Sequence, residues 1–237
     1  ENHGCIIFME KQWLQEAITH HSVWCNAIAQ SHGIITDWRE DVWFSEQPMP
    51  PFYPNLITLH NDASVDEYIS DIESVVPVGW GIKDSYKALS LSHRGFKAAF
   101  EAAWYCLLPN QGHIWSKTSR PAIKSVREHD ALNRWVTAWG DSTEIFHPKL
   151  LENHEVDLIY SERDGVITGG LATNLSGKSV GISNAFGQPA DILDCIHSIS
   201  KAYPDRGIVG YGSKAEMATL AKVGFQELGE LRVWLRI

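Results

Sequence analysis

Four cysteines are among the side chains that could do chemistry in this chain, and their spacing bears on redox state. They are Cys5, Cys25, Cys106 and Cys195. None forms a CxxC pair, and their spacings resemble no disulfide framework. We therefore expect buried free thiols in a reducing compartment, most simply the cytoplasm.

Eleven histidines raise the question of a metal site. His20 and His21 are adjacent, so a helix would point them to different faces. Cys195 and His197 stand two residues apart, a spacing that also does not share a helix face. No metal-ligand motif of fixed spacing emerges, so the sequence predicts no metal centre.

A serine nucleophile is the third kind of chemistry to consider. The segment Gly181-x-Ser183-x-Ala185 lacks the second glycine of a nucleophile elbow, and it lies at the end of a predicted strand. A Ser–His–Asp hydrolase stays open as an alternative.

Two glycine-flanked aromatic residues belong to a repeated pattern, V-G-[WY]-G-x-K, at residues 78–83 and 209–214. In each copy a predicted short helix and a Gly-Phe pair follow, and Trp80 aligns with Tyr211 and Trp104 with Trp234. Glycines beside a strand end let the backbone open towards a ligand, although a tight turn without a ligand is the alternative. The copies are 209 − 78 = 131 residues apart and their element order matches, which predicts a duplication.

The elements that would position these residues follow from apolar periodicity, first in a predicted N-terminal unit over residues 1–108. Helices are expected over 10–31, 65–75 and 84–93, and strands over 36–46, 56–60 and 78–83. The segment 96–108 combines helical spacing of its apolar residues with an aromatic content typical of strands, so its type stays open.

The second predicted unit covers residues 109–237. A strand over 114–119, a helix over 128–139 and a helical turn over 148–153 come first. An antiparallel meander over 156–162, 166–174 and 179–186 follows, because an Asp-Gly turn is the strongest short hairpin signal. A helix over 190–202, a strand over 207–211, a helix over 214–222 and a strand over 225–235 complete the unit.

Charge and composition limit the classes of partner. The chain has 20 basic and 29 acidic residues, a formal charge of −9, which disfavours general nucleic-acid binding. No segment approaches the roughly 20 apolar residues of a membrane span, and the start lacks a signal peptide's basic region. Ten tryptophans are spread along the chain and predict a core braced by large aromatic side chains.

The second unit resembles the GNAT superfamily of acyl-CoA N-acyltransferases in element order and local pattern. The matching residues are the meander ending in 180–186, the helix from 190, the strand 207–211, Gly224-Phe225 after a helix ending Ala221-x-x, and the closing strand to Leu235. The resemblance implies a mixed α+β fold with a central, mostly antiparallel twisted sheet flanked by helices. With the repeat, it implies a tandem GNAT-like arrangement whose first copy is degenerate.

The resemblance also implies where an acyl donor would bind. In that fold the strand equivalent to 179–186 splays from the strand equivalent to 207–211, and the gap admits the pantetheine arm of acetyl-CoA or another acyl-CoA. The helix N-terminus that follows would face the pyrophosphate. The implied donor-binding residues are Ile182, Ala185, Phe186, Gly187, Gln188, Ala190 and Gly212.

In a GNAT-like site an amine would attack the thioester. Ser183 and Asn184 would then orient the acyl carbonyl, and Tyr211 would serve as the acid. Two features depart from the family pattern. The phosphate loop has one glycine, no positive charge and Asp191, which would repel phosphate, and Leu220 occupies the position of the usual tyrosine acid.

Three functions remain open from the sequence. The first is N-acyl transfer from an acyl-CoA-type thioester to an unknown small amine or peptide, with no nucleic-acid or membrane partner. The second is a catalytically inactive GNAT-like protein that binds a ligand or partner. The third is an aminoacyl transferase like the Fem type, which the acidic charge disfavours if the donor is a tRNA.

Overall fold

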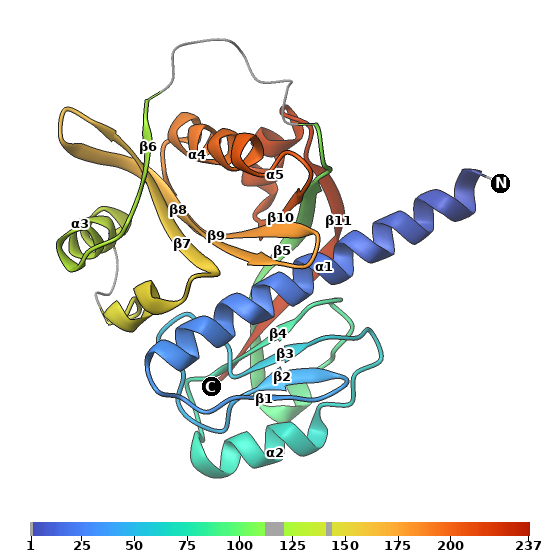
Figure 1. Ribbon diagram of the computed structural model, residues 1–237. Helices are drawn as coiled ribbons and strands as arrows, with labels where there is room; N and C mark the ends of the chain where they lie inside the picture. The colour runs from blue at the N-terminus through green and yellow to red at the C-terminus, as the bar shows by residue number, and fades with distance from the viewer. Residues whose placement is uncertain (1, 112–120, 141–143) are drawn as a thin grey trace.

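The computed structural model describes residues 2–111, 121–140 and 144–237, with side chains from Glu10 onwards. These residues form one mixed sheet with the strand order β1-β2-β3-β4-β11-β5-β10-β9-β8-β7-β6 (Figure 1). The β3–β4 and β9–β10 pairs are parallel, and the other neighbouring strands pair antiparallel. The predicted strand over 114–119 lies outside the described residues.

The helices and strands follow the predicted order over most of the described chain. The helices are α1 (Asn2–Ser31), α2 (Asp66–Val75), α3 (His129–Trp139), α4 (Pro189–Ala202) and α5 (Lys214–Ala221), with 3₁₀ turns at Ser92–Arg94 and Pro148–Glu152. The strands are β1 (Asp37–Trp38), β2 (Val42–Phe44), β3 (Leu56–Thr58), β4 (Gly81–Asp84), β5 (Phe96–Leu107), β6 (Ile123–Ser125), β7 (Val156–Arg163), β8 (Val166–Ser176), β9 (Ser179–Gly187), β10 (Gly207–Gly212) and β11 (Gln226–Arg236).

Side-chain alternation along β5 shows how the sheet separates two layers of helices. Trp104 and Cys106 pack with α1 on one face, whereas Tyr105 and Leu107 pack with α4 and α5 on the other. Helix α1 crosses the middle of the sheet, α2 covers the β1–β4 end, α4 lies over β7–β9, and α5 lies over β5 and β10 (Figure 1). From Ala17 to Ala29 most residues of α1 are buried, and only the face with Thr19, Val23 and Asn26 is partly exposed.

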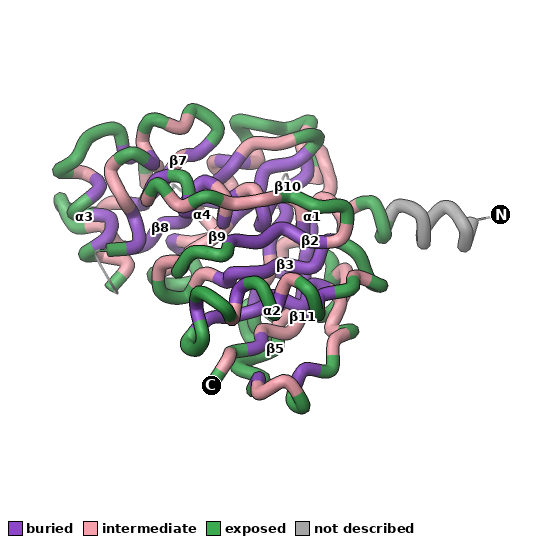
Figure 2. The backbone as a smooth tube through the Cα atoms, turned by 90° about the horizontal axis from the view of Figure 1, so that it is seen from below, coloured by how far each residue is buried: buried purple, intermediate pink, exposed green. Residues whose placement is uncertain are grey.

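Tryptophans brace the core on both sides of the sheet. Trp24, Trp43, Trp104 and Trp135 are fully buried on the face that α1 covers, and Trp80 and Trp234 are buried with α2 on the other face, which confirms the expected aromatic packing for these residues. Figure 2 shows the buried segments gathered along the strands and α1, with exposed segments in the turns at the rim. No helix in the described part of the chain combines the length and the apolar character needed to cross a membrane.

Two predicted elements of the first half are wrong, and one open segment is settled. Residues 84–93 do not form a helix, because both carboxylate oxygens of Asp84 accept backbone N–H groups, from Ala88 at 3.0 Å and Leu89 at 2.9 Å, and so stabilise a turn. The predicted strand over 36–46 is a hairpin of β1 and β2. The open segment is the strand β5, which lies between β11 and β10.

Candidate functional site

Strands β9 and β10 pair with each other at only three positions. Gly207 pairs with Ser179, Ile208 with Val180, and Val209 with Gly181. Beyond these pairs β10 stays with β5, and β9 stays with β8. The sheet therefore opens between β9 and β10.

A β-bulge lies on β9 just beyond the point of divergence. Ser183 pairs with Ala172 and Phe186 with Gly170, so two residues of β9 face one residue of β8. Asn184, one of the two, has a φ of 51°. A bulge bends its strand and redirects a side chain, and here it lies at the edge of the opening.

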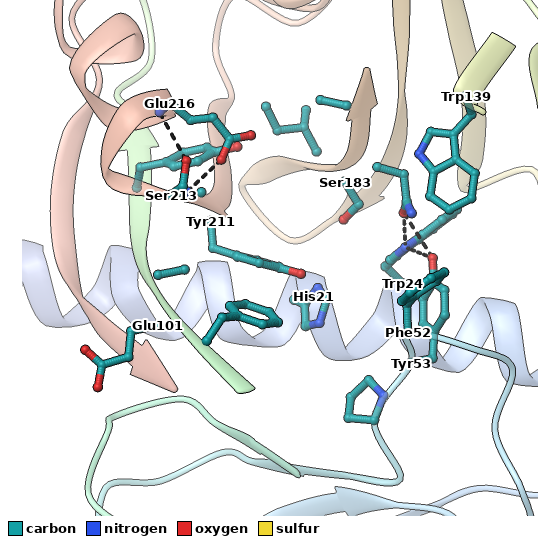
Figure 3. Close-up of a pocket in the computed structure, with 18 residues that line it drawn as sticks. His21, Trp24, Phe52, Tyr53, Glu101, Trp139, Ser183, Tyr211, Ser213 and Glu216 are labelled. Carbon is teal, nitrogen blue, oxygen red and sulfur yellow. Dashed lines mark hydrogen bonds between the residues drawn. The ribbon is translucent and has the colours of Figure 1, made fainter. Parts of the chain in front are cut away.

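A cavity of about 520 Å³ occupies the opening and extends from α1 on one face of the sheet to α5 on the other (Figure 3). It is lined by His21, Trp24, Phe52, Tyr53, Pro54, Phe100, Glu101, Ala102, Tyr105, Trp139, Ile182, Ser183, Asn184, Ala185, Tyr211, Gly212, Ser213 and Glu216. The three predicted catalytic residues are thus brought to one cavity, from two strands.

Asn184 is held by a triangle of hydrogen bonds that the sequence analysis did not foresee. The indole Nε1 of Trp24 donates to Asn184 Oδ1 at 2.9 Å, and the hydroxyl of Tyr53 donates to the same oxygen at 3.0 Å. Burial raises the pKa of Tyr53 well above its usual value, so this phenol keeps its proton and donates. Because both bonds use the amide oxygen, the amide nitrogen of Asn184 is left to donate to a ligand.

Tyr211 is fixed by a buried lysine. The ammonium of Lys83 lies 3.8 Å from the centre of the Tyr211 ring and donates to His21 Nε2 at 2.8 Å. Burial, together with the charge of Lys83, lowers the pKa of His21 well below its usual value, so His21 is neutral. The His21 ring meets the Tyr211 ring edge-on at 5.1 Å, which restricts Tyr211 further.

Two carboxylates line the cavity. Glu101 is paired with Lys87 at 2.8 Å and with Arg232 at 2.7 Å. Glu216 instead caps α5, where it accepts the backbone N–H of Ser213 at 2.6 Å. No ion pair of Glu216 occurs within the described residues, so its charge is available to a cation in the cavity.

The predicted donor-binding residues divide into two sets. Ile182 and Ala185 line the large cavity and also an adjoining apolar groove of about 80 Å³ between α4 and α5, and Gly212 lines the large cavity. The ring of Phe186 packs against Trp135 at 5.1 Å. The remaining residues, Gly187, Gln188 and Ala190, lie at the junction of β9 and α4 and line neither space.

Asp191 is oriented differently from what the sequence suggests. Its side chain is 7% exposed and accepts hydrogen bonds from Thr168 at 3.0 Å and Arg163 at 3.3 Å. The carboxylate therefore lies under β7 and β8 rather than facing a ligand beyond α4. No local sequence pattern predicts this cluster, because Thr168 and Arg163 are 23 and 28 residues away from Asp191.

The other chemistries considered gain no support from the arrangement of side chains. His20 contacts Ser179 at 2.9 Å, but His20 Nδ1 accepts from Asn174, so Nε2 carries the proton and cannot act as a base for the serine. The pKa values of Cys25, Cys106 and Cys195 are raised to about 12, mainly by burial, so they are thiols and not thiolates. Within the described residues no three metal-ligating side chains form a group.

No protein-family model matches the chain, and no curated protein matches its sequence. Solved structures do match over most of both chains. A GCN5-related N-acetyltransferase from Kribbella flavida covers 91% of this chain and 95% of its own at 7% identity, with a TM-score of 0.64. A functionally unknown conserved protein from Staphylococcus epidermidis ATCC 12228 covers 84% and 92% at 11% identity, with a TM-score of 0.59.

A GNAT-family protein from Novosphingobium aromaticivorans DSM 12444 covers 87% of this chain and 91% of its own at 10% identity, with a TM-score of 0.53. At sequence identities this low, structural similarity shows a shared fold but does not show a shared activity. The predicted mixed α+β fold is confirmed. The chain has the fold of the GCN5-related N-acetyltransferases.

Proposed function

We propose that this protein transfers an acyl group from a thioester to a primary amine. The observation that carries the proposal is the end of β9–β10 pairing at Gly181 and Val209, directly beside the cavity of about 520 Å³. An extended thioester arm fits between diverging strands, where unpaired backbone groups are available to its amides. The acyl carbonyl would then lie beside Ser183 and Asn184.

The composition of the cavity favours a cationic acceptor with an apolar or aromatic body. Its walls include six aromatic residues besides Tyr211, namely Trp24, Phe52, Tyr53, Phe100, Tyr105 and Trp139. Glu216 supplies negative charge, and no lysine or arginine is among the described lining residues. The charge of Glu101, in contrast, is balanced by Lys87 and Arg232. Aromatic faces and carboxylates attract an ammonium group and offer nothing to a carboxylate or phosphate.

The proposed reaction balances with groups of this cavity. Glu216 takes the proton from the ammonium, and the free amine attacks the thioester carbonyl carbon. The amide N–H of Asn184 donates to the developing oxyanion, the C–S bond breaks, and the thiolate takes a proton from Tyr211. The attacking nitrogen gives its second proton to the resulting tyrosinate as the amide forms, and Glu216 releases the first proton to solvent. Burial, with Glu216 as a smaller cause, raises the pKa of Tyr105, so this phenol is a poor acid towards the thiolate and is not assigned that role.

The test compares two acceptors that differ by one carboxylate, tyramine and tyrosine, with acetyl thioester as donor and the N-acetyl product measured by mass. We expect tyramine to be acetylated at least about tenfold faster, since the carboxylate of tyrosine meets no cation. Asn184→Ala should lower kcat by about 100-fold, the cost of one oxyanion donor, with the melting temperature as the check on folding.

The same experiment separates the proposal from the inactive binding protein. A thioester that binds but acylates neither amine would favour the binding protein, whose supporting observations are Leu220 in place of a tyrosine and the unusual start of α4. Equal rates for both amines would contradict the cationic-acceptor assignment.

A further inference from the structure

The start of α4 is where a GNAT-like fold would hold the pyrophosphate of an acyl-CoA, and its geometry here is unsuited to that anion. The inference that follows rests on the proposed function. Strand β9 ends at Gly187 and α4 begins at Pro189, so Gln188 is the whole connection. A single residue cannot form the loop of several N–H groups that surrounds a phosphate.

The backbone amides of the first turn are largely unavailable. Pro189 has no N–H. The N–H of Asp191 already donates to the carbonyl of Gln188 at 2.9 Å, as does the N–H of Ile192 at 3.2 Å. An anion site at a helix N-terminus depends on several free N–H groups that point at one ligand, and here Ala190 is the one first-turn amide left.

The backbone just before α4 is also packed closely against β8, which leaves no room for a phosphate-binding loop. Gly187 has a φ of 98°, and a Cβ at this position would lie 2.4 Å from the carbonyl oxygen of Thr168 and 2.5 Å from the Cα of Gly169. The end of β9 is therefore pressed against β8. This close packing prevents the segment from rising into a phosphate-binding loop without breaking the β8–β9 pairing.

The local charge opposes a phosphate as well. Asp191 places a buried carboxylate inside the first turn, and Arg163, the cation beside it, lies 3.3 Å from Asp191 and 3.9 Å from Asp194. Arg163 is therefore already engaged by two carboxylates and is not available to bind a phosphate. The formal charge of −9 over the whole chain adds to this repulsion of a polyanionic nucleotide.

The space for the rest of the donor is present and apolar. The groove between α4 and α5 has Ile192, Leu193 and Leu220 on its walls. It joins the large cavity through shared lining residues, among them Ile182 and Ala185. A pantetheine arm needs this combination of strand edge and apolar wall, and it carries no nucleotide.

We propose that the acyl donor is recognised through its acylated pantetheine arm alone and that the nucleotide of CoA contributes nothing substantial to binding. Such an arm is found free, in CoA, or covalently attached to a carrier protein. All three present the same thioester and the same two amides to the opening between β9 and β10.

The test compares kcat/KM for acetyl-CoA and S-acetylpantetheine with tyramine as acceptor. We expect the two values to agree within tenfold, and an acetylated carrier protein, tested in a third arm, shows whether an attached arm also enters. A preference for acetyl-CoA above tenfold overturns the inference. ADP at millimolar concentration should not inhibit, whereas free pantetheine should, and the reverse pattern also overturns it.

A binding measurement keeps this inference separate from the proposed function. If neither thioester acylates an amine, calorimetry still gives a Kd for acetyl-CoA and for S-acetylpantetheine on the full chain. Kd values within tenfold of each other support the inference even where catalysis fails. Tighter binding of acetyl-CoA by more than tenfold, or binding of neither compound, overturns it.

Discussion

Asn184 shows how single residues of the cavity depend on partners far away in the chain. Its amide oxygen is bound by Trp24 of α1 and by Tyr53 of the segment before β3. An asparagine in isolation offers a donor and an acceptor equally. Here the two bonds select the amide nitrogen as the group presented to a ligand, which is what gives Asn184 its proposed role.

Whether a cavity residue can be predicted from the sequence depends on how far apart in the chain its contacts lie. Ser183, Asn184 and Tyr211 lie at ends of predicted strands, where the family resemblance implied a site, and their catalytic roles stay predictions. Lys83 and His21 were missed because they meet only when α1 packs across β4, a contact between residues 62 positions apart. No local pattern encodes such a pair.

His21 should make the stability of the protein depend on pH. Its pKa is well below 6.5 in the folded state and near 6.5 in the unfolded chain, so the unfolded chain binds the proton first as pH falls. The stabilising contribution is therefore complete above about pH 6.5 and is lost below it, with a slope of up to about 1.4 kcal/mol per pH unit.

Urea unfolding at pH 7, 6 and 5 measures this slope. The matched variant is His21→Gln, which keeps an acceptor for Lys83 but cannot titrate. Its free energy of unfolding should fall less steeply between pH 7 and 5 than that of the unsubstituted protein. Parallel pH profiles would contradict the burial of a neutral His21.

At the scale of elements, strong periodicity and the Asp-Gly turn signal were reliable guides, whereas the turn stabilised by Asp84 was not predicted. The meander, α4, β10, α5 and β11 lie within one or two residues of their expected bounds. The expected helix over 84–93 failed because Asp84 binds two backbone amides of the turn that follows. The segment 96–107 is a strand because it pairs with β11 on one side and β10 on the other. These partners come from distant parts of the chain, so the residues of the segment itself could not decide between helix and strand.

The junction of β9 and α4 gives a prediction about stability. Gly187→Ala places a methyl group against the backbone of Thr168 and Gly169 at a φ of 98°, so we expect a loss of about 2 kcal/mol or more. Gly165→Ala is the control, because Gly165 has a φ of 78° but no atom within 4 Å of its Cβ position. Urea unfolding should find Gly187→Ala clearly less stable than Gly165→Ala, and equal losses would mean that the close approach is absent.

At the scale of the whole molecule, the two predicted lobes are joined through a shared sheet. Strand β11 from the end of the chain lies between β4 and β5, and β5 lies between β11 and β10. Over the first four strands on each side of the β11–β5 pair the pairing is symmetric, with one parallel pair on each side, β3–β4 and β9–β10, and β6 has no counterpart among the described strands. This symmetry supports the duplication that we propose from the repeat.

The strand pairing changes which residues of the two proposed copies correspond to each other. Trp104 lies opposite Tyr211, and Trp234 lies opposite Ile82. If Trp104 and Trp234 are equivalent, the counterpart of Tyr211 is therefore Ile82 and not Trp80, a shift of two residues that keeps the same face of the strand. The motif alignment matched the glycines of the two copies, and so paired Tyr211 with Trp80, two residues away from the position that the strand pairing indicates.

The most direct test of the account is whether a thioester arm binds between β9 and β10. Because the lobes share one sheet, a single thermal transition is expected, and a ligand at 100 times its Kd adds about 2.7 kcal/mol, or roughly 5–10 °C in a chain of this size. Ala185 is exposed and lines both the cavity and the groove, so Ala185→Trp fills the opening. Ala218→Trp is the control, on an exposed position of α5 outside both linings.

The melting temperature is measured for all three proteins with and without S-acetylpantetheine and acetyl-CoA. The account predicts a rise of several degrees for the unsubstituted protein and for Ala218→Trp, and no rise for Ala185→Trp. An unchanged melting temperature of the unsubstituted protein with both thioesters, or an equal rise in Ala185→Trp, would contradict it.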